Sequence, residues 1–266
     1  MEKYDVKFKK KFGQNFLKDN RIVKRIVEVS GVDSNSLVIE VGPGGGILTK
    51  ELSMAAKNVI SYEIDKDLIS ELESKLSGIE NVEIIFQDFL EADINNDIKN
   101  YSFDNLFFVS NVPYYITTPI LLKIIRSNLS FKNVVMMVQK EVGDRFCSSC
   151  GTRDYGSITV LLNYFFDIHK EFNVSRKQFV PEPNVDSVVV SFHEKSNRLK
   201  VNNFDFFERI IRDSFQFKRK TLRNNLKKYD LEKIEKVLVK YGYDLNVRAE
   251  CLNYEVFVSI ANALWK

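Results

Sequence analysis

The sequence predicts an α/β fold in which a parallel, doubly wound sheet precedes a smaller all-helical region. Three observations support this class. Short apolar runs alternate with segments of helical periodicity between residues 37 and 138. A glycine-rich turn, 42–46, directly follows the first apolar run. Beyond about residue 196 only helical patterns remain. We therefore expect a large domain over residues 1–196 and a small helical domain over 197–266.

The charge of the chain is unevenly distributed. Hydrophobic residues make up 44% of the 266 residues and charged residues 28%, which are globular values. The net charge is only +3. Residues 1–25 hold nine Lys or Arg against three acids, and residues 198–228 hold ten against three. These segments carry +6 and +7, so the remaining residues carry −10. This asymmetry predicts a face that binds a polyanion.

No feature of the sequence indicates secretion, a membrane span or a metal site. No apolar signal segment follows Met1, and the longest uncharged run, 105–122, contains two prolines and several polar residues. We expect a cytoplasmic protein that does not enter a membrane. Cys147 and Cys150 form a C-x-x-C pair, but no second pair follows, and the chain has only two histidines. A reduced surface loop is favoured over a zinc site.

The N-terminal segment combines lysines with aromatic and amide side chains. The lysines, which include Lys10 and Lys11, are typical either of a solvated tail or of an arm that binds phosphates. The part from Phe12 to Leu17 is too apolar for a tail, and we expect it to fold back over the domain. Asp19 is predicted to cap a helix that places Ile22, Val23, Ile26 and Val27 on one face.

The first two predicted strands end at groups suited to a nucleoside. The strand 37–41 runs into the glycine turn, where the backbone is free to approach a ligand beside the start of the next helix. The strand 58–62 ends at Glu63, about 20 residues beyond the glycines, where a carboxylate can accept hydrogen bonds from both ribose hydroxyls. Dinucleotide enzymes use a similar arrangement, so the kind of nucleoside cofactor stays open at this point.

The next two strands add an acid and an amide at the same edge of the sheet. Asp88 follows the strand 82–86 and is suited either to an adenine amino group or to a helix N-cap. The strand 106–109 leads to Asn111, Val112, Pro113 and Tyr114. The Asn111 amide and a backbone carbonyl freed by the turn would hold both N–H bonds of an exocyclic amine. The Tyr114 ring would stack on the base. The alternative is an ordinary turn at the end of a strand.

A basic segment lies in the predicted helical domain. The strand 134–138 and a closing strand, 187–192, complete the sheet before it. In the segment 215–226, Phe, Gln and Asn alternate with cations, which favours phosphate clamping with stacking over a merely solvated helix face. The residues predicted to bind RNA are Lys10, Lys11, Arg219, Lys220 and Arg223.

Together these motifs resemble those of the rRNA adenine dimethyltransferase family, and within it the branch that acts on small-subunit rRNA. The match spans essentially the whole chain, and the segments that carry it are 12–17, 40–44, 62–65, 87–88, 111–114, 154–156, 179–187 and 219–226. Departures are slight: Val112 stands where Leu is common, and Cys150 where Pro is usual. The resemblance implies a Rossmann-like, S-adenosylmethionine-dependent methyltransferase sheet with a helical rRNA-binding domain.

The resemblance also implies the roles of individual residues. Cofactor contacts are expected from Asn15, Leu17, Gly42, Glu63, Asp88 and Asn111. Catalytic roles are expected for Asn111, Pro113 and Tyr114. The implied substrate is a pair of adjacent adenines in the hairpin near the 3′ end of 16S rRNA, each dimethylated at N6 late in the assembly of the 30S subunit. We expect a monomer. We also expect that no metal is needed, because the sulfonium methyl is already electrophilic.

Three other functions stay open on the sequence. A nicotinamide oxidoreductase would share the glycine turn and Glu63, but it leaves the segment 111–114 unexplained. A large-subunit (23S) rRNA adenine methyltransferase that confers macrolide resistance would share the catalytic motifs. A catalytically silent rRNA-binding assembly factor would keep the fold without methyl transfer.

Overall fold

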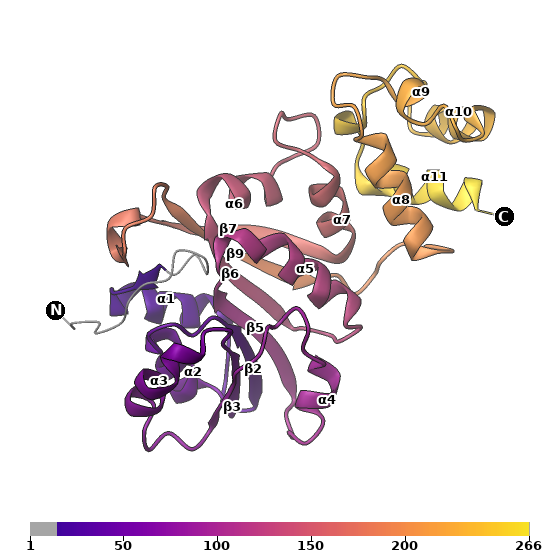
Figure 1. Cartoon of the computed structure of the whole chain (residues 1–266). Coiled ribbons are helices and arrows are strands. Elements are labelled where there is room, and N and C mark those ends of the chain that lie inside the picture. Colours follow the sequence, from indigo (N-terminus) through magenta and orange to yellow (C-terminus); the bar gives the residue numbers. More distant parts are fainter. Residues whose placement is uncertain (1–14, 266) are drawn as a thin grey trace. The chain divides into compact units, whose positions relative to one another are not determined.

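The computed structural model describes residues 15–265, which form two compact units (Figure 1). The sheet unit comprises the described residues up to Gly143 together with residues 169–194. The helical unit comprises residues 144–168 and the described residues from 195 onward. The segment 144–168 is thus grouped with the C-terminal helices, whereas the functional division at residue 196 stays a prediction.

The central sheet has seven strands in the order β4-β3-β2-β5-β6-β9-β7, which confirms the predicted α/β class (Figure 1). The first five strands of this order are parallel. β9 instead runs antiparallel to β6. The sheet was expected to be parallel, and this strand departs from that expectation. The chain between β6 and β9 contains α6, α7, β7 and β8, so β9 returns to β6 only after a long excursion. The strands are β2 (Ser36–Val41), β3 (Asn58–Tyr62), β4 (Val82–Ile85), β5 (Asn105–Asn111), β6 (Asn133–Gln139), β7 (Phe166–Val174) and β9 (Ser187–Glu194).

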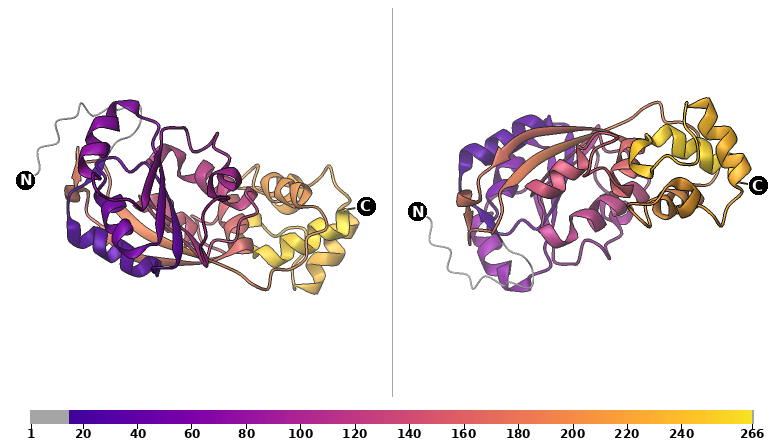
Figure 2. Two further views of the ribbon diagram at one scale, coloured as in Figure 1. Left: turned by 90° about the horizontal axis from the view of Figure 1, so that it is seen from below. Right: turned by 90° about the horizontal axis from the view of Figure 1, so that it is seen from above.

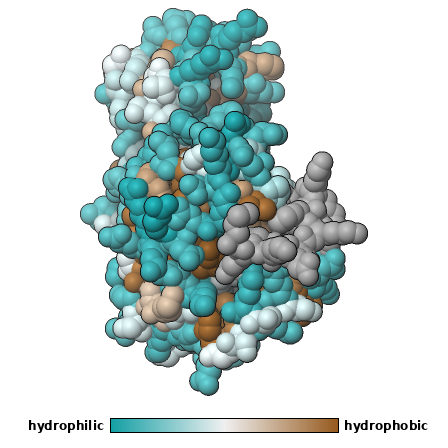
Figure 3. Space-filling view, turned by 90° about the vertical axis from the view of Figure 1, so that its left-hand side faces the viewer, coloured by the Kyte–Doolittle hydropathy of each residue, from teal (hydrophilic) through white to brown (hydrophobic). Residues whose placement is uncertain are grey.

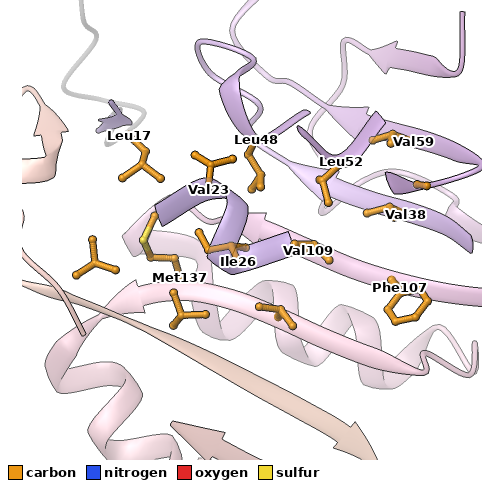
Figure 4. Close-up of a cluster of buried hydrophobic side chains, with 14 of the residues drawn as sticks. Leu17, Val23, Ile26, Val38, Leu48, Leu52, Val59, Phe107, Val109 and Met137 are labelled. Carbon is orange, nitrogen blue, oxygen red and sulfur yellow. The ribbon is translucent and has the colours of Figure 1, made fainter. Parts of the chain in front are cut away.

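Alternate side chains of the strands meet two helices on one face of the sheet (Figure 4). Helix α1 (Asn20–Ser30) begins after Asp19, whose carboxylate accepts from the Arg21 backbone N–H at 2.9 Å, so the predicted cap is confirmed. Helix α2 (Ile47–Ala55) follows the glycine turn. The buried cluster beneath them includes Val23, Ile26, Leu48, Leu52, Val38, Val59, Phe107, Val109 and Met137.

On the opposite face the rings of Tyr62, Phe89 and Phe108 pack together, with centroids 5.2 and 5.9 Å apart. Lys123 donates to the Leu90 and Ala92 carbonyl oxygens there, at 2.9 and 2.6 Å. The elements on this face of the sheet are α4 (Ile94–Ile98), a 3-10 turn η3 (Tyr114–Ile116) and α5 (Thr117–Arg126). Between β3 and β4 lie η2 (Lys66–Leu68) and α3 (Ile69–Lys75).

A two-residue strand, β1 (Phe16–Leu17), pairs with β8 (Phe179–Val180). Both residues of β1 are buried, and Phe16 packs against Leu68 and Leu72. The expected fold-back of the N-terminal segment is confirmed for these two residues, whereas Phe12 lies outside the described range.

The helical unit is held together by aromatic side chains. Tyr164 lies 5.1 Å from Phe207 and 6.2 Å from Tyr254 between ring centroids, so three helices share one core. Helix α11 packs on both α8 and α10 in the orange and yellow part of the ribbon (Figure 2). The helices are α7 (Ser157–Phe165), α8 (Phe204–Ser214), α9 (Leu222–Asn225), α10 (Leu231–Lys240) and α11 (Tyr254–Leu264). Helix α6 (Lys140–Phe146) directly follows β6 in the chain.

The face shown in Figure 3 is mainly hydrophilic, with hydrophobic residues in separate patches. Between residues 15 and 265, none of the helices has both the length and the apolar character that a membrane crossing requires.

Candidate functional site

A cleft opens at the carboxyl edge of β2, β3, β4 and β5, within the sheet unit. In open α/β sheets this edge is where ligands bind. The strand ends bring together every predicted cofactor-binding and catalytic residue. Those that line the cleft are Asn15, Leu17, Gly42, Glu63, Asp88, Asn111, Pro113 and Tyr114.

The glycine turn forms one wall of the cleft. Gly42 and Gly44 have φ angles of +72° and +54°, which side chains with a Cβ rarely adopt. A Cβ on Gly44 would lie 2.8 Å from the Phe16 ring, and one on Gly42 would lie 3.4 Å from Pro113. The turn therefore packs against both the N-terminal strand and the segment that follows β5, and a larger residue at Gly44 would displace the first of these.

Glu63 lies on the floor of the cleft and is only 5% exposed. One carboxylate oxygen accepts from the Asp65 backbone N–H at 2.8 Å, and the other from the Gly44 N–H at 3.4 Å. Burial raises the pKa of this carboxyl, and the backbone donors oppose that shift. Each oxygen keeps a second lone pair for a ligand hydroxyl.

Asp88 is half-buried beside Glu63 in the lining of the cleft. Its Oδ1 accepts from the Leu90 N–H at 2.8 Å, which closes a turn rather than capping a helix. The helix N-cap alternative is therefore wrong, since the next helix is capped by Asp93. The Oδ2 atom forms no hydrogen bond with a described residue, so it is available to a donor in the cleft.

Asn111 is the last residue of β5, two positions beyond the apolar run that predicted the strand. Its Nδ2 donates to the Asn15 carbonyl oxygen at 3.2 Å, which fixes the amide plane. The Oδ1 atom accepts no bond from residues 15–265. The Pro113 carbonyl accepts from the Ile116 N–H at 3.1 Å, whereas the Val112 carbonyl accepts from no described group. Two acceptors, Asn111 Oδ1 and the Val112 carbonyl, are thus free at this turn.

Tyr114 is held by a bond that the sequence did not reveal. Its hydroxyl lies 2.7 Å from Ser187 Oγ, and Ser187 is fully buried at the start of β9. Burial raises the pKa of the Tyr114 phenol, so the group stays neutral at physiological pH. Since the hydroxyl is paired, the ring face is the part of Tyr114 that a ligand meets.

Three further residues of the cleft were missed by sequence reasoning. Tyr115 and Ile64 are 55% and 42% exposed although both are large and apolar, and Phe16 supports the glycine turn. The signal for the first two was their position, since Ile64 directly follows Glu63 and Tyr115 directly follows Tyr114. An exposed apolar side chain beside a paired polar one is typical of a site for a flat ring.

Glu40 lies beneath the glycine turn and is 1% exposed. Its Oε2 accepts from Thr49 Oγ1 at 2.7 Å and from Ser61 Oγ at 2.6 Å. Burial raises the pKa of the Glu40 carboxyl to about 7, although both hydroxyls oppose the shift, and the nearby Glu63 charge adds to it.

The raised pKa of Glu40 predicts a pH-dependent stability. The folded chain holds this proton more tightly than the unfolded chain, whose pKa is 4.5. The stabilisation is complete below the unfolded pKa and is lost as the pH rises through about 7. Denaturant unfolding at pH 5, 6, 7 and 8 should show Glu40→Gln losing less stability with pH than the wild type, by at most about 1.4 kcal/mol per pH unit. Parallel curves for the two proteins would contradict the assignment.

The predicted RNA-binding residues divide between two parts of the chain. Arg219, Lys220 and Arg223 are exposed on the helical unit and make no salt bridge to a described residue. Lys10 and Lys11 lie outside the described residues. Asn225, one of the amides interleaved with these cations, is buried rather than exposed, and its amide bonds the backbone of Ser214 and Phe217.

The C-x-x-C pair shows no metal-site geometry. Cys147, Cys150 and Cys251 form no disulfide with any residue between 15 and 265. Over residues 15–265, no group of three His, Cys, Asp or Glu side chains is placed to hold a metal ion.

The chain resembles known proteins over nearly its whole length. The model of the family described as ribosomal RNA adenine dimethylase matches residues 5–266. The protein called ribosomal RNA small subunit methyltransferase A from Geobacillus sp. (strain WCH70) is 40% identical over 273 residues, covering 99% of this chain and 94% of the relative. Its namesake from Bacillus cereus (strain B4264) is 39% identical over 274 residues, with the same coverage of both chains.

Two solved structures share the fold. A dimethyladenosine transferase from Plasmodium falciparum superposes with a TM-score of 0.77 at 29% identity, over 92% of this chain and 95% of the other. The 23S rRNA methyltransferase ErmE superposes with a TM-score of 0.72 at 28% identity, over 94% and 99% of the two chains.

Proposed function

Because this chain belongs to the ribosomal RNA adenine dimethylase family, we propose that it transfers methyl groups from S-adenosylmethionine to N6 of two adjacent adenines in the 3′-terminal hairpin of small-subunit (16S) rRNA. The observation that carries the proposal is the meeting of Glu63, Asp88 and Asn111 around one cleft. The family makes the chain an rRNA adenine dimethyltransferase. The choice of the small subunit rests on the names of the relatives that are 39–40% identical to it.

The hydrogen-bond acceptors of the cleft fit S-adenosylmethionine. The unused lone pairs of Glu63 suit the two ribose hydroxyls, and Asp88 Oδ2 suits the amino group of the adenine ring. Asn15 and Leu17 close the cleft beside Asn111, and Gly42 leaves room for the backbone to approach the ligand. When bound, the cofactor supplies a methyl group on an electrophilic sulfonium.

The segment after β5 is suited to grip the amine that receives the methyl group. Asn111 Oδ1 and the Val112 carbonyl accept the two N–H bonds of adenine N6, which directs the nitrogen lone pair away from them. Both acceptors also stabilise the positive charge that grows on N6 as it gains a fourth substituent. Pro113 fixes the turn that presents them, and the Tyr114 ring stacks on a base rotated out of its helix. The proton leaves after the nitrogen has become cationic, so no general base is assigned.

The Tyr114–Ser187 bond predicts a measurable positioning effect. Ser187→Ala should lower kcat/KM about two- to tenfold, because the ring loses the partner that sets its angle. In a Tyr114→Phe background the same change should have no further effect. Steady-state kinetics of the four proteins provide the test. Ser191→Ala is the matched control, since this buried β9 serine bonds Glu171 instead. Additive losses from the two substitutions would show that Ser187 does not act through Tyr114.

The exposed cations of the helical unit support rRNA as the partner. Arg219, Lys220 and Arg223 have no acidic partner among the described residues, so they are free to neutralise phosphates. We assign Lys10 and Lys11 to the same role from the sequence alone. We propose that the chain acts as a monomer on immature 30S subunits, late in their assembly in the cytoplasm.

The deciding experiment is methyl transfer from labelled S-adenosylmethionine to small subunits from a strain that lacks this modification. Nuclease digestion and mass spectrometry would identify the methylated nucleosides, and large subunits would be run in parallel. Dimethyladenosine confined to small-subunit RNA is the expected result. Label only in large subunits would favour the 23S activity of ErmE, with which this chain shares its fold. Tight binding without label in either would indicate an assembly factor without catalysis.

A further inference from the structure

An aromatic side chain stands exposed among the cations of the helical unit. Phe217 is 56% exposed, and it makes no ring contact with any residue from 15 to 265. Lys218, Arg219 and Lys220 follow it directly and are exposed as well. Phe215, two residues earlier, is the opposite case, because its ring lies 5.9 Å from that of Phe257 and 6.4 Å from that of Tyr155. Only one of these two phenylalanines therefore serves the core.

The backbone that presents Phe217 is firmly held. Asn225, only 6% exposed, accepts from the Phe217 N–H at 3.2 Å and donates to the Phe217 carbonyl at 3.3 Å. The same amide donates to the Ser214 carbonyl at 2.7 Å. The Lys220 N–H then closes a turn on the Phe217 carbonyl at 2.9 Å. Phe217 is thus displayed by a tied turn, which lowers the entropy lost when a ligand binds to it.

The surroundings of Phe217 define the ligand that it fits. Three consecutive cations favour a chain of phosphates, and an unpaired ring offers a face on which a nucleobase can stack. A base inside a duplex is stacked on both sides already, so the fit is to an unpaired base.

We infer that Phe217 stacks on an unpaired base of the small-subunit rRNA while Lys218, Arg219 and Lys220 hold the flanking phosphates. The inference rests on the proposed function and adds to it a second point of contact, on a unit none of whose described residues lines the cofactor cleft. Stacking contributes affinity that varies little with salt, whereas the phosphate contacts produce the salt dependence.

The test measures binding of the full-length protein to unmethylated small subunits at several salt concentrations. Phe217→Ala should weaken binding about tenfold at every concentration and leave the slope of log K against log salt unchanged. Phe217→Trp should bind at least as tightly as the wild type. Phe217→Leu should behave like the alanine variant, because it is apolar but has no ring. Arg219→Gln should reduce the slope by roughly 0.7 to 0.9.

Two controls separate the possible causes of a change. All variants should bind S-adenosylmethionine and melt as the wild type does, since the Phe217 side chain lies outside the core. A photocrosslinking amino acid at position 217 should attach to rRNA. Attachment to a ribosomal protein, wild-type affinity of Phe217→Ala, or wild-type affinity of Phe217→Leu would overturn the stacking role and leave methyl transfer intact. Absence of binding and transfer by the unchanged protein would overturn the proposed function and this inference with it.

Discussion

Replacing Asn111 by alanine is expected to lower kcat for methyl transfer by at least about 100-fold. The change removes Oδ1, one of the two free acceptors at the end of β5, and with it the group that orients N6 and stabilises its developing charge. Binding to small subunits should stay near that of the wild type, because the cations predicted to hold the RNA phosphates lie on other segments. Single-turnover transfer and subunit binding, measured on the same preparations, provide the test.

A control is needed because Asn111 also donates to the Asn15 carbonyl. Affinity for S-adenosylmethionine should be measured for each variant, since displacement of the N-terminal strand would weaken cofactor binding as well as turnover. Asn100→Ala serves as the matched exposed substitution in the same unit and should be silent. Turnover like that of the wild type in Asn111→Ala would refute the proposed grip on the amine.

Gly143→Ala is expected to destabilise the protein by about 1–3 kcal/mol. Gly143 lies in α6, and a Cβ at this position would be 2.2 Å from the fully buried Val188 of β9 and 3.2 Å from Val190. The helix or the strand must shift to admit the methyl group. Thermal unfolding should show a midpoint lower by about 2–4 °C for each kcal/mol lost.

Two further substitutions make the packing explanation specific. Gly156→Ala adds the same methyl group where no atom lies within 4 Å, and it should change the midpoint little. Val188→Ala opens space opposite Gly143, so the double variant should lose less stability than the sum of the two single variants. Strictly additive losses would argue against a clash between these two positions.

The edge of the sheet was the most predictable part of the site. Glu63, Asp88 and Asn111 each follow an apolar run, and parallel strands bring such positions together whatever the rest of the chain does. Periodicity likewise predicted the helix after Asp19, whose cap and apolar face both depend on neighbours within a few residues.

The parts that escaped prediction depend on contacts between distant residues. Nothing around Tyr114 indicates that its hydroxyl meets Ser187, and nothing around Gly143 reveals Val188 above it. Asn225 shows the opposite case. Its place in a basic segment suggested contact with a ligand, but its amide donates to the Ser214 carbonyl and stabilises a turn. Local pattern gives the chemistry of a side chain, and tertiary packing decides whether that chemistry is used internally or presented outward.

The pairing of β1 with β8 has a consequence for the order in which the enzyme becomes competent during its synthesis. Phe16 and Leu17 leave the ribosome early, but their partners Val180 and Phe179 follow much later. Until then the β1 residues have no strand to pair with, although Phe16 can already pack against Leu68 and Leu72. Folding of the parallel strands can proceed in the meantime. The wall of the cleft that Asn15 and Leu17 provide reaches its final form only after β8 has been made, so we expect full affinity for the methyl donor only from that stage.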